Sequence, residues 1–519
     1  MISRTPRVAF VAAATLSLAV LATGPAQAQK RGGDLVILQQ STPRSLDAVT
    51  STEQAVRNVT MHLYEMLVTR DEAGNPIPDL ASKVEESADG LTYTFTLRQG
   101  VKFHNGKEMT SEDAKASVER YGRIGFDRAD FAKVKAVAAP GKYTLTITLT
   151  DRVPSFIEQL SSPRAPMVII PSEEAALEGN KTNAIGTGPF QLVDFVPDSH
   201  IKMKRFDAYT ANAGTGDRDG FSGRKVVHVD GVVFRIVPEA NARIAALETK
   251  AAHFSEQIPS LTAKRLKDSK DIKVVTLMPW SMAFTIQNSG PGGGPTEKLG
   301  VRRAIQAAID ADDVMAISTD GVYRLDHAFN YPESQYFSAE VGKAVYNQAN
   351  PAKAKQLLAD AGYKGEEIII IASSQIATVK AQAEVIAEQL KAAGMKVRID
   401  MYDSPGYIAK SQQPEGWSIY VGEFGLAPSI GPYGLPNFWT GPKNLQKFRD
   451  PLLDTAFDEL KSKPTLAERK AAADRFYTRV TDQAYAVKLG DNGLLQAVRS
   501  EVKNFKPYRI PRAWGVWLD

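Results

Sequence analysis

The sequence predicts an α/β protein with two lobes, because a strand–helix–strand pattern occurs in two separate regions. In the later region, Ile368 to Ile371 is a short β-branched run, and apolar residues then recur at spacings of three and four from Ile376 to Ala393. Gly394 suits the end of that helix, and apolar and charged residues alternate from Lys396 to Met401. Such a unit normally forms two parallel strands with a right-handed crossover.

The earlier region repeats this pattern. Residues Val226 to Val237 are strand-rich, Pro238 to Lys250 have a helical pattern, and Lys273 to Leu277 predict another strand. Two such cores in one chain of 519 residues predict two lobes, each with its own hydrophobic interior.

Residues Asp89 to Ser117 join a strand, a turn and a capped helix. Tyr93, Phe95 and Leu97 alternate with threonines, as in a strand with one buried face. His104-Asn105-Gly106 follows as a turn, and Thr110 stands three residues before Asp113, which predicts a capping box at the start of a helix.

This order resembles a signature block of the solute-binding protein family 5 of ABC importers, which includes the dipeptide, oligopeptide and nickel receptors. Segments similar to other parts of the family follow in the expected order over more than three hundred residues: Ser45-Leu46-Asp47, Tyr64–Leu67, Pro78–Ala81, Gly186–Phe190, Val301–Ile305 with Ile309-Asp310, and Pro351–Leu358.

The resemblance implies a two-lobed periplasmic binding protein fold (type II, cluster C) with an extra subdomain in the first lobe. It places lobe I at residues 29–277 plus 489–519, with the subdomain at about 75–188. Lobe II then comprises residues 278–488. It further implies one membrane-bound partner, an ABC permease and ATPase complex.

The first 28 residues predict a cleaved secretory signal peptide. Arg4 and Arg7 precede an apolar run from Val8 to Ala22, and Ala26-Gln27-Ala28 suits a cleavage site. The mature protein would therefore begin at Gln29 in the periplasm. A lipid-anchored receptor would have a cysteine at the cleavage site, and the chain has no cysteine, so we do not expect a lipoprotein.

Composition argues against several other functions. Without cysteine there is no disulfide, thiolate metal site or cysteine nucleophile. A net charge of +4 with interspersed lysines and arginines does not predict nucleic-acid binding. The six histidines are scattered, and no catalytic motif is recognisable, so we expect no catalytic residue, no metal site and no cofactor.

Two segments are candidates for contact with a small-molecule ligand. Trp280 and Met282 follow a strand close to where the chain should cross between lobes, and residues 417–442 combine aromatics, glycines and prolines, which suit ligand stacking next to a cleft. An ordinary core position is the alternative for Trp417, Phe424 and Trp439. By resemblance, residues 421–427 line the ligand site in lobe II, and residues 41–44 and Tyr121 are counterparts in lobe I. The predicted ligand-binding residues are Thr42, Arg44, Tyr121, Trp280, Met282, Trp417, Val421, Glu423, Phe424, Gly425 and Ala427.

One difference from the peptide receptors affects the expected ligand. In those receptors the lining segment has a tryptophan and an aspartate that pairs with the ligand's α-amino group; here Phe424 and Ala427 occupy these positions. A buried ammonium without a carboxylate is costly, so peptide recognition would require Glu423 as a substitute.

The sequence thus predicts a monomeric, exported receptor that binds a peptide or peptide-like small molecule. Three alternatives remain open: a receptor for a non-peptide solute (an opine, a glycoside or a metal chelate), a chemosensory or chaperone-like binding protein, and an exported hydrolase.

Overall fold

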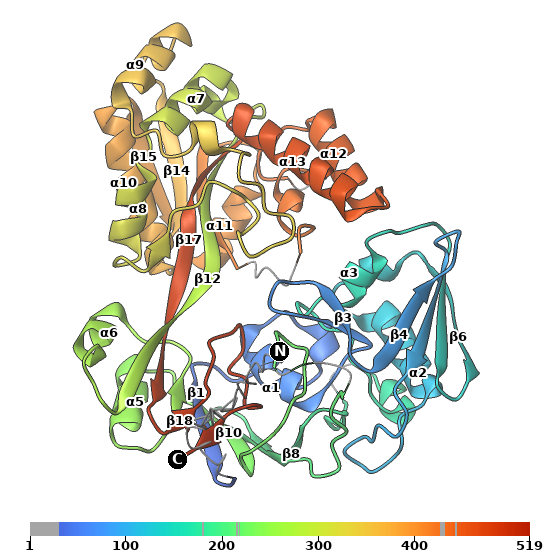
Figure 1. Ribbon diagram of the computed structural model, residues 1–519. Helices are drawn as coiled ribbons and strands as arrows, with labels where there is room; N and C mark the ends of the chain where they lie inside the picture. Colours follow the sequence, from blue (N-terminus) through green and yellow to red (C-terminus); the bar gives the residue numbers. More distant parts are fainter. Residues whose placement is uncertain (1–30, 179–180, 214–215, 217, 426–430, 442–443) are drawn as a thin grey trace, which may run out of the picture.

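The computed structural model describes residues 31–178, 181–213, 216, 218–425, 431–441 and 444–519. The predicted signal peptide at 1–28 and the candidate Ala427 lie outside these residues. The chain forms two lobes, one above the other in Figure 1, and two long strands, β12 (Ile272–Gln287) and β17 (Ala486–Arg499), run from one lobe into the other. Below, lobe I means the part that contains residues 31–277 and 494–519, and lobe II the part that contains residues 281–492.

One mixed sheet extends through both lobes. Its strands follow the order β15-β14-β16-β12-β17-β11-β1-β10-β9-β8, and β13 also pairs with β17. The bounds of the other strands are β1 Asp34–Gln39, β8 Phe190–Val196, β9 His200–Arg205, β10 Gly231–Ile236, β11 Phe254–Ser255, β13 Tyr323–Arg324, β14 Glu367–Ser373, β15 Lys396–Tyr402 and β16 Ile419–Phe424.

The strand–helix–strand unit predicted from residue 368 is confirmed. Strands β14 and β15 pair in parallel over their whole length, from Glu367 opposite Lys396 to Ser373 opposite Tyr402. Helix α10 (Ala377–Ala392) connects them and buries Val379, Ala383, Ile386 and Leu390, the apolar positions of the predicted pattern.

The strand–helix–strand unit predicted from residue 226 differs in its second strand, and the prediction of Lys273–Leu277 for that strand is wrong. Strand β10 and helix α5 (Ala240–Glu248) form as predicted, but the strand that completes the unit is β11. Strands β10 and β11 both pair in parallel with β1. The predicted strand at Lys273–Leu277 is part of β12 and pairs antiparallel with β17. Since β11 has only two residues, its sequence gives no periodic pattern.

The segment at 89–117 lies in a separate part of lobe I. Four antiparallel strands form the order β4-β5-β7-β6, with bounds Ala81–Glu86, Thr92–Leu97, Thr144–Leu149 and Val134–Gly141 respectively. Helix α2 (Ser111–Ile124) follows β5, and its capping box is present: the Thr110 backbone N–H donates to the Asp113 carboxylate at 3.0 Å. Figure 1 shows this small sheet at the side of lobe I.

The two lobes have separate hydrophobic cores. The large core of lobe I combines residues between 35 and 254 with residues between 498 and 516, so the C-terminal segment packs into lobe I. A smaller cluster of lobe I surrounds α5 and α6 (Ser260–Leu266). In lobe II one cluster lies under α12 (Pro451–Ser462) and α13 (Leu466–Asp482). Another lies under the helices between residues 299 and 392, α7 to α10.

The other helices and short strands have the following bounds: α1 Gln54–Leu63, α3 Phe156–Leu160, α4 Ser172–Ala175, α6 Ser260–Leu266, α7 Leu299–Ala308, α8 Ala311–Ser318, α9 Pro351–Asp360, α11 Ser404–Ser411, α12 Pro451–Ser462, α13 Leu466–Asp482, β2 Val68–Arg70, β3 Pro76–Pro78, β18 Val502–Lys503 and β19 Trp517–Leu518, with 3-10 turns η1 Ala48–Thr50, η2 Arg128–Phe131, η3 Gly294–Glu297, η4 Lys343–Val345 and η6 Leu435–Phe438. Among the residues described, no helix has the length and apolar character needed to span a membrane.

Candidate ligand-binding site

The two strands that join the lobes change their register where they cross. Leu277 of β12 lies opposite Leu494 of β17, whereas Ser281 lies opposite Asn492, so β12 contains two more residues than β17 at this point. On the lobe I side of the crossing, β17 also pairs with β11. On the lobe II side, β12 also pairs with β16. The crossing therefore lies near residues 278–280 and 493.

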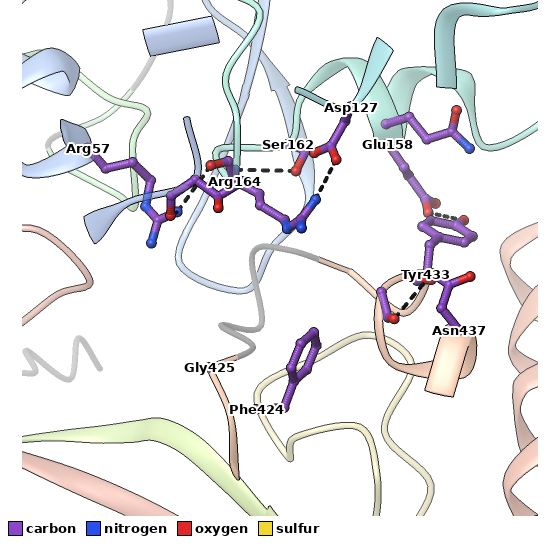
Figure 2. A pocket seen from close by; sticks show the side chains of 12 residues that line it. Arg57, Asp127, Glu158, Ser162, Arg164, Phe424, Gly425, Tyr433 and Asn437 are labelled. Carbon is purple, nitrogen blue, oxygen red and sulfur yellow. Dashed lines mark hydrogen bonds and ion pairs between the residues drawn. The ribbon is translucent and has the colours of Figure 1, made fainter. Parts of the chain in front are cut away.

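A cavity of about 380 Å³ lies between the lobes. Lobe I contributes residues near α1, α3 and the loop after α2, and lobe II contributes the end of β16 and the region of η6 (Figure 2). The lining residues are Thr52, Arg57, Asp127, Glu158, Gln159, Ser162, Arg164, Phe424, Gly425, Tyr433, Gly434 and Asn437. A pocket of this size suits a small molecule.

Two arginines dominate the lobe I wall. Arg57 projects from α1 and donates to the Thr52 carbonyl at 2.7 Å and to the Arg164 carbonyl at 3.1 Å. The Arg164 guanidinium is paired with the Asp127 carboxylate and lies 5.0 Å from the centre of the Phe126 ring. Burial and the nearby charges of Arg509 and Arg164 lower the pKa of Arg57 to about 9, so its guanidinium is still protonated at neutral pH.

Glu158 connects the two walls. Its carboxylate accepts hydrogen bonds from three groups of lobe II: Tyr433 Oη at 2.5 Å, Arg469 Nη2 at 2.6 Å and Tyr336 Oη at 2.9 Å. Burial raises the pKa of Tyr433, and so does the Glu158 charge. The same two causes raise the pKa of Tyr336 to about 12. Both phenols therefore stay protonated and can donate.

Two of the predicted ligand-binding residues line the cavity. Phe424 ends β16, Gly425 follows it, and both form part of the lobe II wall (Figure 2). The Gly425 carbonyl also accepts from Arg509 Nη2 at 3.1 Å. Trp280 lies at the crossing, half-buried, with the Arg509 guanidinium 4.4 Å from its ring centre, so the C-terminal segment covers it.

Glu423 faces away from the cavity. Successive side chains of a strand point to opposite faces, so Glu423 and Phe424 are on different sides of β16. Glu423 accepts from Gln382 of α10 at 3.2 Å and from Ser281 at 3.3 Å, and burial raises the pKa of its carboxyl. Val421, also on this face, is buried in the core beneath α10.

Trp417 and Met282 are core residues. Trp417 is 1% exposed, and it precedes β16 at the end opposite to Phe424, where its indole donates to the Gln413 carbonyl at 2.9 Å. Met282 is fully buried in the same cluster of lobe II. The structure therefore places Trp417 in the hydrophobic core, which was the alternative to a ligand contact.

The lobe I candidates do not line the cavity. Tyr121 is buried, and its hydroxyl donates to the Ala165 carbonyl at 2.7 Å, which supports the wall from behind, next to Arg164. Thr42 donates to Asp198 at 2.7 Å. Arg44 has a side chain that is 87% exposed and is paired with Glu53 at 2.8 Å.

Sequence reasoning missed the charged residues of the cavity. Tyr433 and Asn437 fall within the aromatic segment 417–442, but Arg57, Asp127, Glu158 and Arg164 come from short elements of lobe I that have no motif of their own. Nothing in their local sequence distinguishes them from surface charges. Among the described residues, no group of three or more His, Asp or Glu side chains is placed to hold a metal ion.

Two lobes with separate cores, two connecting strands and a cavity lined from both sides define the class of two-lobed solute-binding proteins. The chain belongs to the bacterial extracellular solute-binding proteins, family 5, whose middle-region profile matches residues 75–446. The resemblance seen in the sequence is thereby confirmed, and the protein acts outside the cytoplasm.

The chain is also similar to individual proteins. The oligopeptide-binding protein AppA of Bacillus subtilis (strain 168) is 27% identical over 429 residues, which cover 75% of this chain and 74% of that protein. The glutathione-binding protein GsiB of Pectobacterium atrosepticum is 27% identical over 465 residues, covering 86% and 85%. The solved structure of AgaA in complex with agropinic acid, from A. tumefaciens R10, has a TM-score of 0.72 at 24% identity and covers 94% of this chain and 99% of that one.

Proposed function

We propose that this protein is the receptor of an ABC importer, and that it binds a peptide or peptide-like small molecule between its lobes and delivers it to a permease and ATPase complex at the inner membrane. The cavity lined by Arg57 and Glu158 of lobe I and by Phe424 and Tyr433 of lobe II is the observation that carries the proposal. The oligopeptide and glutathione named for AppA and GsiB support a peptide-like ligand.

Closure of the lobes is the mechanism we propose for binding. Among the strands that the structure describes, only β12 and β17 of the main sheet run between the lobes. Their register changes at the crossing, which suits a hinge. A ligand that contacts both walls stabilises the closed state by the difference between its affinities for the closed and open states.

A non-peptide solute is the second candidate. A free peptide has an α-ammonium group that needs a carboxylate when buried. The two acids of the cavity, Asp127 and Glu158, are already paired with Arg164 and Arg469, and Glu423 faces α10. An opine, a glycoside or a metal chelate requires no such acid, and the agropinic acid bound to AgaA supports this class of ligand.

The remaining parts of the proposal concern processing and assembly. We expect a monomer that catalyses no reaction and binds no nucleic acid, cleaved after Ala28 and free of a lipid anchor. Edman sequencing of the exported protein should begin at Gln29. An intact Met1 would contradict the proposed cleavage.

Native mass spectrometry of the protein purified from its host tests the function. A retained molecule of a few hundred daltons, released on denaturation, is the expected result, and deletion of the gene should abolish uptake of that molecule. Unchanged uptake with normal binding would instead support the chemosensory alternative.

A further inference from the structure

The Arg57 guanidinium has no carboxylate partner among the residues that the structure describes. Its three hydrogen bonds go to neutral oxygens: the carbonyls of Thr52 and Arg164, and the side-chain amide of Gln54 at 2.8 Å. A neutral amide could donate to these oxygens equally well. The bonds therefore account for the position of the side chain but not for its charge.

A second arginine, Arg509, lies beside it, and its guanidinium also stacks 4.4 Å from the centre of the Trp280 ring. Arg509 donates to the Trp280 carbonyl at 2.5 Å and to the Gly425 carbonyl at 3.1 Å, and Gln54 donates to the Arg509 carbonyl at 2.5 Å. Gln54 thus touches both Arg57 and Arg509. Within the described ranges no carboxylate pairs with Arg509 either, and burial lowers the pKa of its guanidinium.

The acids of the cavity do not compensate these two charges. Asp127 is paired with Arg164, and Glu158 is paired with Arg469. Among the described residues, the wall around Gly425 therefore has two partly buried positive charges in excess, which solvent screens less than charges on an open surface.

An uncompensated buried charge is unfavourable until an opposite charge reaches it. The arginine fork matches the two oxygens of a carboxylate or of a phosphate group, and hydrogen bonds between charged groups are about twice as strong as neutral ones. A negatively charged ligand would remove the repulsion between Arg57 and Arg509, whereas a cationic ligand would add to it.

We propose that the ligand of this receptor has an oxyanion, a carboxylate or a phosphate, that binds Arg57, and that the charge of Arg509 strengthens this contact. This inference rests on the proposed function, since it names the chemistry of the ligand in the same cavity. It selects acidic metabolites and peptides with a free carboxyl end over cationic solutes.

Paired compounds test the proposal directly. Calorimetry and thermal-shift measurements would compare carboxylic acids, including N-acetylated dipeptides and opine-like imino diacids, each with its carboxamide, and phosphate esters each with the parent alcohol. We expect at least one acid or phosphate ester to bind ten times more tightly than its neutral partner or better. A series in which no anion binds better than its neutral partner would overturn the proposal.

Variants then assign the contact. Arg57→Gln keeps a donor for the carbonyls and should remove the preference for the anion, whereas Arg57→Lys keeps the charge and should retain part of it. Arg265→Gln is the matched control, because Arg265 is an exposed residue of α6 that pairs with Glu248. An unchanged preference in a folded Arg57→Gln variant would also overturn the proposal.

The outcome separates this inference from the function on which it rests. If the ligand retained from the host proves neutral or cationic, the receptor function stands and the proposal of an oxyanion on the ligand is wrong. If no compound of any charge shifts the melting temperature and no molecule is retained, the receptor function itself fails.

Discussion

Glu158 of lobe I and Arg469 of lobe II form an ion pair across the cavity, with 2.6 Å between the carboxylate and Nη2, and each side chain is only 8% exposed. Tyr336 and Tyr433 donate to the same carboxylate from lobe II. Since all three partners lie in the opposite lobe, these contacts can form only when the lobes are close together. The ion pair would therefore be a contact of the closed state proposed above.

Removal of the Glu158 charge should shift the protein towards an open state. Glu158→Gln leaves the buried Arg469 without its carboxylate partner, and loss of one member of a buried pair typically costs about 3–5 kcal/mol. Small-angle scattering should show a larger radius of gyration than for the wild type, and ligand affinity should fall by at least tenfold, because less of the protein is closed.

The control for this change is Glu248→Gln, which removes a carboxylate from a partly exposed ion pair within lobe I. It should alter neither the radius of gyration nor the affinity. If Glu158→Gln has the dimensions of the wild type both with and without ligand, the pair does not hold the lobes together.

Trp417, which precedes β16, and Phe424, which ends it, should differ in the effect of an alanine substitution on stability and binding. Trp417→Ala removes a fully buried indole from the core of lobe II, so the free energy of unfolding should fall by about 3–5 kcal/mol while the folded protein binds normally. Phe424→Ala removes a half-buried ring from the cavity wall and should weaken binding by about 1–3 kcal/mol, with a smaller loss of stability. Urea unfolding and calorimetry distinguish the two, and the reverse assignment would mean that Trp417 reaches the ligand.

Glu423 should not take part in ligand binding. Its carboxyl lies against Gln382 and Ser281 on the α10 face of β16. Glu423→Gln should therefore leave ligand affinity within about threefold of the wild type, as expected for a residue outside the contact surface. A loss of affinity confined to ligands with a free amine would show that Glu423 substitutes for the missing aspartate after all.

The parts of the fold that local sequence patterns specify were predictable. The parallel β14–α10–β15 unit has periodic apolar residues on every element, and the Thr110–Asp113 capping box needs only four consecutive residues. Strand β11 was missed because two residues are too few for a pattern, and its pairing with β1 depends on contacts more than two hundred residues apart.

The cavity was predictable only on the lobe II side. Phe424 ends a recognisable strand and Gly425 follows it. The face of β16 on which Glu423 lies depends on strand register, however, and a shift of one residue moves every side chain to the other face. Arg57 and Glu158 acquire their roles from tertiary placement: the partners of Glu158 lie between 178 and 311 residues further along the chain. No local feature of the sequence encodes such contacts.

The stability of lobe I should depend on pH through His62. Its Nδ1–H donates to the Asn58 carbonyl at 2.8 Å and its Nε2 accepts from the Ala513 N–H at 3.1 Å, an arrangement that only the neutral ring can make. The ring is fully buried, with Trp514 5.0 Å away, and burial lowers the pKa of His62 to about 4.

In the unfolded chain a histidine has a pKa of about 6.5, so between about pH 6.5 and pH 4 the unfolded state binds more protons than the folded state. The contribution of His62 to the free energy of unfolding is thus complete above about pH 6.5 and is lost as the pH falls towards 4. At pH 4.5 this loss amounts to about 2–3 kcal/mol. His62→Gln does not titrate and should lack this loss. Urea unfolding of both proteins at pH 7.5 and 4.5 measures the difference in this loss. Burial raises the pKa of Asp79 to about 6, which has the opposite effect on stability. Both proteins contain Asp79, so its contribution cancels in the comparison. Equal losses in the two proteins would show that His62 is protonated in the folded state.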